Sequence, residues 1–293
     1  MFDKLKANIF FNSFLKRHNI NEAYKMVPPT DSWYDTISTV HRSLAQMQQL
    51  PQETWQITSH DGLKLKGVYY PNNSDKTMIW VHGYTSHAER ESAFPSLFYR
   101  SLGFNVLVPY LRAHGPSQGK YITFGALEPL DMQRWVDKVN QLHPNGKILI
   151  HGLSMGGGVA LNMTATPMNN VKCFVADAPS HNIELAFKNI THGIFKTDND
   201  TIANFAIKRF NKKFKCDIRD YDSLKIVSQS KYPILLSAGS NEHCEELFDQ
   251  IKQANPMETN VVILPGCNHG HGMYKQTEMY QTAIKQLVEK YID

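Results

Sequence analysis

The strongest constraint on the fold is an alternation of short apolar runs with longer segments of helical periodicity. Strands joined by helices of about ten or more residues need crossover connections, so they lie parallel in a sheet that helices cover on both faces. The apolar runs stand at residues 77–81, 104–108, 147–150, 171–176, 233–237 and 260–264, and the helical patterns at 91–102, 127–142, 155–164, 244–254 and 274–291.

A hairpin precedes this alternation. The runs 55–58 and 63–70 flank a turn at Asp61-Gly62, and the second run alternates apolar and polar residues as a half-buried strand does. Together with the parallel strands, they predict an α/β fold with a mostly parallel central sheet of about eight strands and helices on both faces.

Two segments lie outside the sheet. Residues 1–53 are predicted to form a helical extension ahead of a main domain at 54–293. From 179 to 231 no strand pattern occurs, and we interpret this interval as a helical cap over the carboxyl ends of the strands, where open α/β sheets bind ligands. An excursion with a purely structural role is the alternative.

The helical pattern at residues 3–18 allows two interpretations. Packing against the main domain is predicted by its apolar residues, which are Leu5, Ile9, Phe10 and Leu15. An amphipathic helix for a membrane or a partner is the alternative, because Phe10 and Phe11 stand near the basic pair Lys16-Arg17. The apolar patch is too short and too interrupted for a signal peptide or a membrane span, so no stable membrane insertion is expected.

Composition limits the possible partners. The formal charge of +4 arises from 31 basic and 27 acidic residues, which is too small and too dispersed to indicate nucleic acid binding. The four cysteines are widely separated with no C-x-x-C, so we expect reduced thiols and a cytoplasmic protein rather than a disulfide framework.

A candidate nucleophile stands at Gly152-Leu153-Ser154-Met155-Gly156, directly after the apolar run 147–150 and before a helical pattern. In this context G-x-S-x-G forms a sharp strand-to-helix turn that exposes the serine hydroxyl above the sheet. The flanking glycines allow the strand and helix backbones to approach closely. The first N–H of the following helix, at Met155, is suited to binding an oxyanion.

Two histidines are candidates for the general base. His269 and His271 lie on a loop that leaves the last strand, from which a side chain can reach an adjacent elbow. We favour His269 over His271. A zinc site is not expected, because further ligands such as His243, Cys244 and Cys267 lack a recognisable spacing.

In the α/β-hydrolase arrangement, which this G-x-S-x-G turn resembles, the acid that orients the histidine follows the serine and precedes the histidine in chain order. Glu242 is the first carboxylate after the strand 233–237, and Asp177, at the end of the strand 171–176, is the second candidate. The other oxyanion donor is predicted to be the N–H of Tyr84, because Gly83 lets the backbone aim it inward.

These motifs together resemble the α/β-hydrolase superfamily, and more narrowly bacterial serine hydrolases and esterases with an N-terminal helical extension and a small helical cap. The resemblance covers residues 55–292 and implies Ser154 as nucleophile, His269 as base, an acid at Glu242, donors at Tyr84 and Met155, and no cofactor. Two positions depart from the family pattern: Tyr110 stands before Leu111-Arg112 where aspartate is usual, and Glu242 replaces an aspartate.

The predicted function is cleavage of small-molecule carboxylic esters with small or medium acyl groups, through an acyl-enzyme on Ser154. An amidase, peptidase or acyltransferase using the same triad is one alternative, and a non-catalytic binding protein with this fold is another. The cap aromatics either line the acyl site or form a core, and the residues concerned are Phe187, Ile190, Phe195, Phe205 and Phe210.

Overall fold

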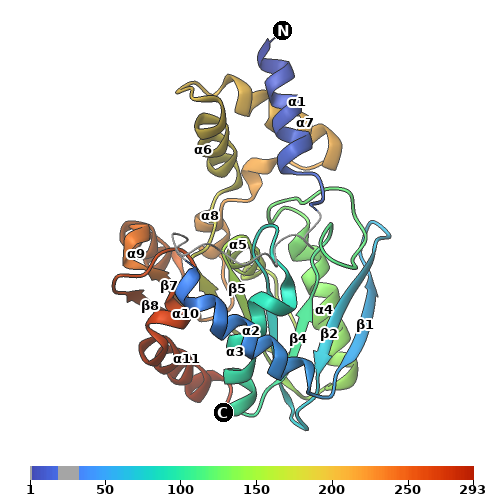
Figure 1. Cartoon of the computed structure of the whole chain (residues 1–293), viewed down its shortest axis with the longest axis vertical. Helices are drawn as coiled ribbons and strands as arrows, with labels where there is room; N and C mark the ends of the chain where they lie inside the picture. Colours follow the sequence, from blue (N-terminus) through green and yellow to red (C-terminus); the bar gives the residue numbers. More distant parts are fainter. Residues whose placement is uncertain (1, 19–32) are drawn as a thin grey trace.

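The computed structural model describes residues 2–18 and 33–293. An eight-stranded sheet runs through it in the order β1-β2-β4-β3-β5-β6-β7-β8, with helices on both faces (Figure 1). The strands are β1 (Glu53–Thr58), β2 (Lys64–Tyr70), β3 (Lys76–Val81), β4 (Asn105–Pro109), β5 (Lys147–Leu153), β6 (Val171–Asp177), β7 (Ile234–Gly239) and β8 (Thr259–Leu264).

Only the first part of the sheet is antiparallel. β1 pairs with β2 and β2 pairs with β4 in antiparallel fashion, whereas all other neighbouring strands are parallel. The predicted hairpin and the predicted α/β fold with a mostly parallel sheet of eight strands are therefore confirmed.

Both faces of the sheet are covered by helices. The helices are α1 (Phe2–Phe14), α2 (Tyr34–Gln48), α3 (Ala88–Ser101), α4 (Glu128–Leu142), α5 (Met155–Met163), α6 (Ile183–Phe195), α7 (Thr201–Phe214), α8 (Ser223–Val227), α9 (Glu245–Ala254), α10 (Gly272–Lys275) and α11 (Thr277–Tyr291), with the 3-10 turns η2 (Ile218–Asp220) and η3 (Ser240–Glu242). None of the helices among the described residues is long and apolar enough to cross a bilayer.

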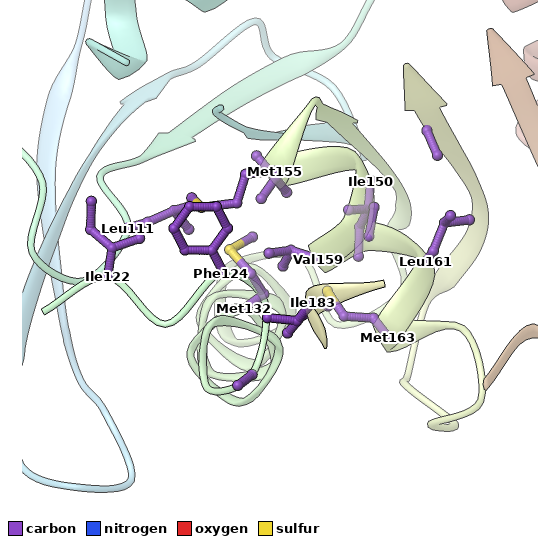
Figure 2. Close-up of a cluster of buried hydrophobic side chains, with 14 of the residues drawn as sticks. Leu111, Ile122, Phe124, Met132, Ile150, Met155, Val159, Leu161, Met163 and Ile183 are labelled. Atoms are coloured by element: carbon purple, nitrogen blue, oxygen red, sulfur yellow. The ribbon is translucent and has the colours of Figure 1, made fainter. Parts of the chain in front are cut away.

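The sheet separates the apolar core into two layers, one on each of its faces. On β3, Ile79 and Val81 pack into the layer beneath α4, α5 and α9, while Met78 and Trp80 pack beneath α3 and α11. This explains why the strand is apolar at successive positions, since each face of a doubly covered sheet needs its own apolar residues. Figure 2 shows part of the first layer, where Val159 of α5 and Met132 of α4 lie near Ile150 of β5.

The interval between β6 and β7 is helical, as predicted. It holds α6, α7 and α8, and α6 is capped by the preceding Asn182, whose side chain accepts a hydrogen bond from Leu185 N at 2.9 Å. The helix α1 packs on α7 rather than on the sheet, and with α6 and α7 it stands at one end of the molecule's long axis (Figure 1). The apolar interior of this cap is continuous with the layer beneath α5.

The two helices of the N-terminal extension lie apart. Phe10 and Phe11 of α1 are buried against the cap, and the ring of Phe10 meets that of Phe187 edge-on at 5.3 Å. By contrast, α2 packs along α3 through Leu44 and Met47, beside the main sheet. The predicted packing of residues 3–18 is confirmed for Phe10 and Leu15, which are buried, and is wrong for Leu5 and Ile9, which are exposed.

Two glycines allow the turn between β5 and α5 to form. A Cβ on Gly152 would lie 2.0 Å from the carbonyl oxygen of Gly156, and a Cβ on Gly156 would lie 1.9 Å from that of Val81. Both obstacles are backbone atoms, so neither can move away by a change of rotamer. The local motif is therefore a steric requirement of the fold as well as of the site.

Replacing Gly156 by alanine is expected to lower the free energy of unfolding by more than about 3 kcal/mol, because β3 and α5 must separate. Gly193 supplies a matched control, since it lies in α6 and a Cβ added to it would meet no atom within 4 Å. Gly193→Ala should raise stability by roughly 0.5–1 kcal/mol, because alanine has the better helix propensity. Denaturant unfolding measures both, and a Gly156→Ala protein with unchanged stability would contradict the close approach.

Candidate active site

Ser154 occupies the turn between β5 and α5 in a strained conformation. Its φ of 59° and ψ of −118° are rare for a residue with a side chain and are typical of a nucleophile at such a turn. The backbone holds it there: Ser154 N donates to the carbonyl of Asp177 at 2.8 Å, and its own carbonyl accepts from Gly158 N at 3.1 Å. Met155 begins α5, so its N–H has no acceptor within the helix.

His269 and Glu242 complete a hydrogen-bonded chain from the serine. The Nε2 atom of His269 lies 2.9 Å from Ser154 Oγ, and its Nδ1 atom lies 2.5 Å from Glu242 Oε2. Glu242 closes the turn η3 that follows β7, and its Oε1 accepts a hydrogen bond from Gly239 N at 2.9 Å. Glutamate is one methylene longer than aspartate, and this turn places Glu242 so that the carboxylate of the longer side chain meets His269 Nδ1.

The charge of Glu242 favours the protonated form of His269. The hydrogen bond to Glu242 raises the pKa of His269 above its usual 6.5, against the opposing effect of burial. An imidazole with this partner accepts a proton readily at Nε2 and is held in one tautomer, with Nδ1 as the donor to the carboxylate.

Asp177, the second acid candidate, has a different set of partners. Its buried carboxylate accepts hydrogen bonds from Ser237 Oγ at 2.8 Å and from the hydroxyl of Tyr280 at 2.9 Å. Burial raises the pKa of Asp177 to about 6. The Tyr280 hydroxyl also contacts His151 Nε2 at 3.0 Å, so the Asp177 side chain belongs to a buried polar network that fixes α11 against β5 and β6.

His271, the second histidine candidate, packs on a tryptophan ring. Its ring is buried and meets the ring of Trp33 edge-on, with centroids 4.3 Å apart. The structure thus brings together Ser154, His269 and Glu242 of the predicted site residues, and it places Asp177 and His271 in structural contacts.

The loop after β3 is held by a glutamate that sequence reasoning missed. Both carboxylate oxygens of Glu91 accept from Gly83 N, at 3.0 and 3.1 Å, and one of them also accepts from the indole N–H of Trp80 at 3.0 Å. Burial raises the pKa of Glu91 to about 7. No motif marks this glutamate, which follows the glycine by eight positions and lies inside α3.

The same loop carries Tyr84, the other predicted oxyanion donor. Gly83 N is occupied by Glu91, and Thr85 N donates to His114 Nε2 at 3.2 Å. Tyr84 N–H donates to no other residue in the described parts of the chain. A Cβ on Gly83 would lie 3.4 Å from Ser154 Cβ, so the loop passes directly beside the serine.

A pocket of about 350 Å³ opens beside the serine and the histidine. Trp33, Ile37 and Val40 line it from α2 and the residue before that helix, and Glu91 and Tyr274 line it from α3 and α10. The pocket therefore lies between the N-terminal extension and α3. The prediction that residues 1–53 form a helical extension could not show which surface α2 would cover.

The cap aromatics do not line this pocket. Phe187 and Phe210 are fully buried, and their rings meet edge-on at 5.6 Å inside the cap. The expectation that this group lines the acyl site is wrong for this pocket, and the alternative of a core is correct for Phe187 and Phe210. The largest side chains of the cap fill the space between its own helices.

The unusual Tyr110 packs without disturbing its loop. Its ring is buried and covers Gly115, and its hydroxyl donates to Glu89. Arg112, in the same loop, donates to Asp131 at 2.7 Å and to Asp61 at 3.0 Å. Tyrosine is therefore accommodated because Glu89 accepts its hydroxyl.

Among residues 2–18 and 33–293, His60, Asp61 and Asp131 are grouped closely enough to hold a metal ion. The guanidinium of Arg112 already lies between the two carboxylates and pairs with both. This group therefore fits an ion-pair network better than a cation site. The four cysteines are free thiols, and none of them belongs to that group.

Comparison with known proteins agrees with this architecture. The family described as serine aminopeptidase, S33, matches residues 72–264. YqkD, an uncharacterized protein of Bacillus subtilis, is 31% identical over 169 residues, which are 57% of this chain and 52% of YqkD. The chain thus spans about half the length of the curated relatives it matches.

Solved structures share the fold over nearly the whole chain. The esterase Pf2001 of Pyrococcus furiosus superposes with a TM-score of 0.66 and 26% identity, over 92% of this chain and 100% of the esterase. An α/β hydrolase of Vibrio vulnificus gives a TM-score of 0.65 at 19% identity, over 98% and 93% of the two chains. Because the family match covers more than half of the chain and the fold agrees with it, this protein belongs to the serine aminopeptidase S33 family of α/β hydrolases.

Proposed function

We propose that this protein is a serine hydrolase that cleaves carboxylic esters of small or medium acyl groups through an acyl-enzyme on Ser154. The observation that carries the proposal is the chain of hydrogen bonds from Ser154 Oγ through His269 to Glu242, with distances of 2.9 and 2.5 Å. A serine, a base and an orienting acid in this geometry are the parts that nucleophilic acyl transfer requires.

In the first half of the reaction, His269 Nε2 takes the proton of Ser154 as Oγ attacks the ester carbonyl. The carbonyl oxygen becomes an oxyanion that accepts hydrogen bonds from the N–H groups of Tyr84 and Met155. His269 then gives the proton to the leaving alcohol, and an acyl-serine remains. Glu242 holds Nδ1–H and stabilises the imidazolium while it carries the proton.

In the second half, His269 takes a proton from water, and the hydroxide attacks the acyl-serine carbonyl. The oxyanion forms again between the same donors. When it collapses, the proton passes from His269 to Ser154 Oγ, and the carboxylic acid leaves. The atoms balance with water as the only co-substrate, so no cofactor is needed.

The pocket supports a small substrate. Its volume of about 350 Å³ is near the lower end of the range of roughly 300–1,000 Å³ found for ligand sites. Trp33, Ile37 and Val40 make one wall apolar, which suits an acyl chain better than a charged group. The similarity to the esterase Pf2001 is consistent with this substrate class.

An aminopeptidase is the second candidate, because a carboxylate lies inside the pocket. Glu91 lines it beside Arg90, and the ionised form of Glu91, which burial disfavours, would attract the ammonium group at the N-terminus of a peptide. The description of the family as serine aminopeptidases favours the same possibility. The triad itself does not distinguish an ester from an amide.

A substrate panel tests the proposal. We expect p-nitrophenyl acetate and butyrate to be hydrolysed with a kcat/KM at least about 10²-fold above that of amino acid p-nitroanilides, because the aniline is the poorer leaving group and the apolar wall favours acyl chains. Faster cleavage of the anilides would instead support the aminopeptidase.

Filling the pocket with a larger side chain should change the enzyme's preference for the length of the substrate's acyl chain. Ile37→Trp is expected to lower kcat/KM for butyrate at least about tenfold more than for acetate, because the indole would occupy the space of the longer chain. Ser38→Trp is the matched control, since Ser38 is the exposed neighbour on the same helix. Equal effects on both esters would show that the acyl chain binds elsewhere.

A further inference from the structure

The helix α1 is apolar on two opposite faces, and the cap covers only one of them. Its inner face holds the buried residues Ala7, Phe10 and Phe11. On the other side, Phe2, Leu5 and Ile9 recur at intervals of three and four residues, which aligns them along one stripe. Their exposed fractions are 75%, 56% and 51%. Exposure of three large apolar side chains in a row indicates an interaction surface.

The end of α6 carries a further exposed apolar side chain. Ile194 in the last turn of α6 is 50% exposed. Lys6 connects the two helices, because its Nζ lies 5.9 Å from the ring centre of Phe2 and 5.7 Å from that of Phe195. Figure 1 shows that this part of the cap lies at the end of the molecule that is farthest from the sheet. We use the name cap tip for the exposed apolar residues Phe2, Leu5, Ile9 and Ile194 together with the nearby cations Lys4, Lys208, Arg209 and Lys212.

A basic hollow lies beside the stripe, between α1 and α7. It has a volume of about 280 Å³, and its cations are Lys4, Lys208, Arg209 and Lys212; none of the described residues that line it is acidic. Arg209 donates to the neutral side chain of Asn8 at 2.7 Å and lies 4.2 Å from the ring centre of Phe11. None of the four forms an ion pair with another residue in the described parts of the chain.

The charge balance of the two helices is one-sided. The helix α1 has two lysines and α7 has four basic residues, whereas Asp3 is the one acidic residue in either helix. Cations whose charge is not balanced within the protein attract an anionic surface, and the adjacent apolar stripe can enter an apolar layer. The two features together match the headgroup and acyl regions of a bilayer.

We propose that the cap tip docks the protein on an anionic lipid bilayer as a peripheral surface helix. Phe2, Leu5 and Ile9 enter the boundary between headgroups and acyl chains, and the cations of the hollow bind lipid phosphates. With 13 residues, α1 is too short to span a bilayer, so it lies in the plane of the surface. A symmetric contact with a second copy fits less well, because it would bring the two sets of cations together. This proposal is independent of the reaction at Ser154.

Sedimentation of the full chain with vesicles tests the proposal. We expect binding to phosphatidylcholine vesicles that contain about one quarter phosphatidylserine, little binding to phosphatidylcholine alone, and weaker binding at high salt. Replacing Phe2, Leu5 and Ile9 together by serine should lower the affinity at least about tenfold. Replacing Lys4, Lys208 and Lys212 by glutamine should lower it on the order of 10²-fold.

Matched controls use exposed side chains of the same kinds outside the cap. Leu142→Ser and Met279→Ser remove exposed apolar residues from α4 and α11, and Lys172, Lys252 and Lys285 supply three exposed lysines for replacement by glutamine. These controls should bind vesicles like the unmodified protein. Far-UV circular dichroism and a cooperative thermal unfolding transition, measured for each variant, report that the fold is intact.

Three outcomes would overturn the proposal. One is failure to bind anionic vesicles, and another is equal loss of binding in the cap-tip and control variants. The third is a protein that self-associates through Phe2, Leu5 and Ile9 without binding vesicles, which would identify the surface as an interface between copies of the chain.

Discussion

Replacing Ser154 by alanine is expected to lower kcat for p-nitrophenyl butyrate by roughly 10⁴–10⁶-fold while leaving the protein folded. The loss is large because no other hydroxyl is hydrogen-bonded to His269, as judged over residues 2–18 and 33–293. The oxyanion donors remain in the variant, so a small residual rate above that of water is also expected. Initial rates under saturating ester measure the effect.

Covalent labelling gives an independent readout of the same residue. A fluorophosphonate probe should modify the unmodified protein at Ser154 and should leave Ser154→Ala unlabelled. Ser228→Ala serves as the control, because Ser228 is exposed and donates to Lys225 O at 2.7 Å in the cap. Full esterase activity in Ser154→Ala, or no labelling of an active protein, would remove Ser154 as the nucleophile.

The second large effect concerns Glu242. Glu242→Gln is expected to lower kcat by roughly 10³–10⁴-fold, because the amide cannot stabilise the imidazolium that forms when His269 carries the proton. Asp177→Asn is the comparison, since Asp177 hydrogen-bonds Ser237 and Tyr280 rather than His269. Its effect on kcat should be less than about tenfold, with its main cost in stability. The reverse ranking would make Asp177 the acid.

The pH profile distinguishes an electrostatic role of Glu242 from a structural one. Since the neutral form of His269 is the base, kcat/KM falls as the pH is lowered through its pKa. Glu242 raises this pKa above 6.5, so the acidic limb of the unmodified protein is expected above pH 6.5. Glu242→Gln removes the negative charge and should move the limb to lower pH. A limb that does not move would contradict the contact between the two side chains.

Most of the fold could be predicted from the sequence because its signals are local. Each strand of the parallel sheet is an apolar run, since helices cover both faces, and β3 and β5 show this directly. The turn at Ser154 was predictable for a similar reason, because a Cβ at Gly152 or Gly156 would collide with backbone atoms. The order serine, acid, histidine along the chain then left few candidates for the base and the acid that act with Ser154.

The choice among those candidates needed distances between segments far apart in the chain. His269 and His271 stand two positions apart, yet one contacts Ser154 and the other packs on Trp33. Likewise Glu242 and Asp177 both follow strands, and only the 3-10 turn after β7 brings a carboxylate to His269. Spacing along the chain does not encode these orientations.

The sequence by itself determined the succession of strands and helices along the chain, the sharp turn at Ser154, and a short set of candidates for the base and the acid that act with this serine. Those features depend on steric and apolar patterns within about twenty residues. Only the tertiary structure decided that α2 forms a pocket wall, that Glu91 holds Gly83, and that α1 joins the cap with its outer face exposed. The physical reason is that an apolar stripe in the sequence shows that a helix buries one face, but not which surface that face covers. Packing between segments far apart in the chain decides the surface.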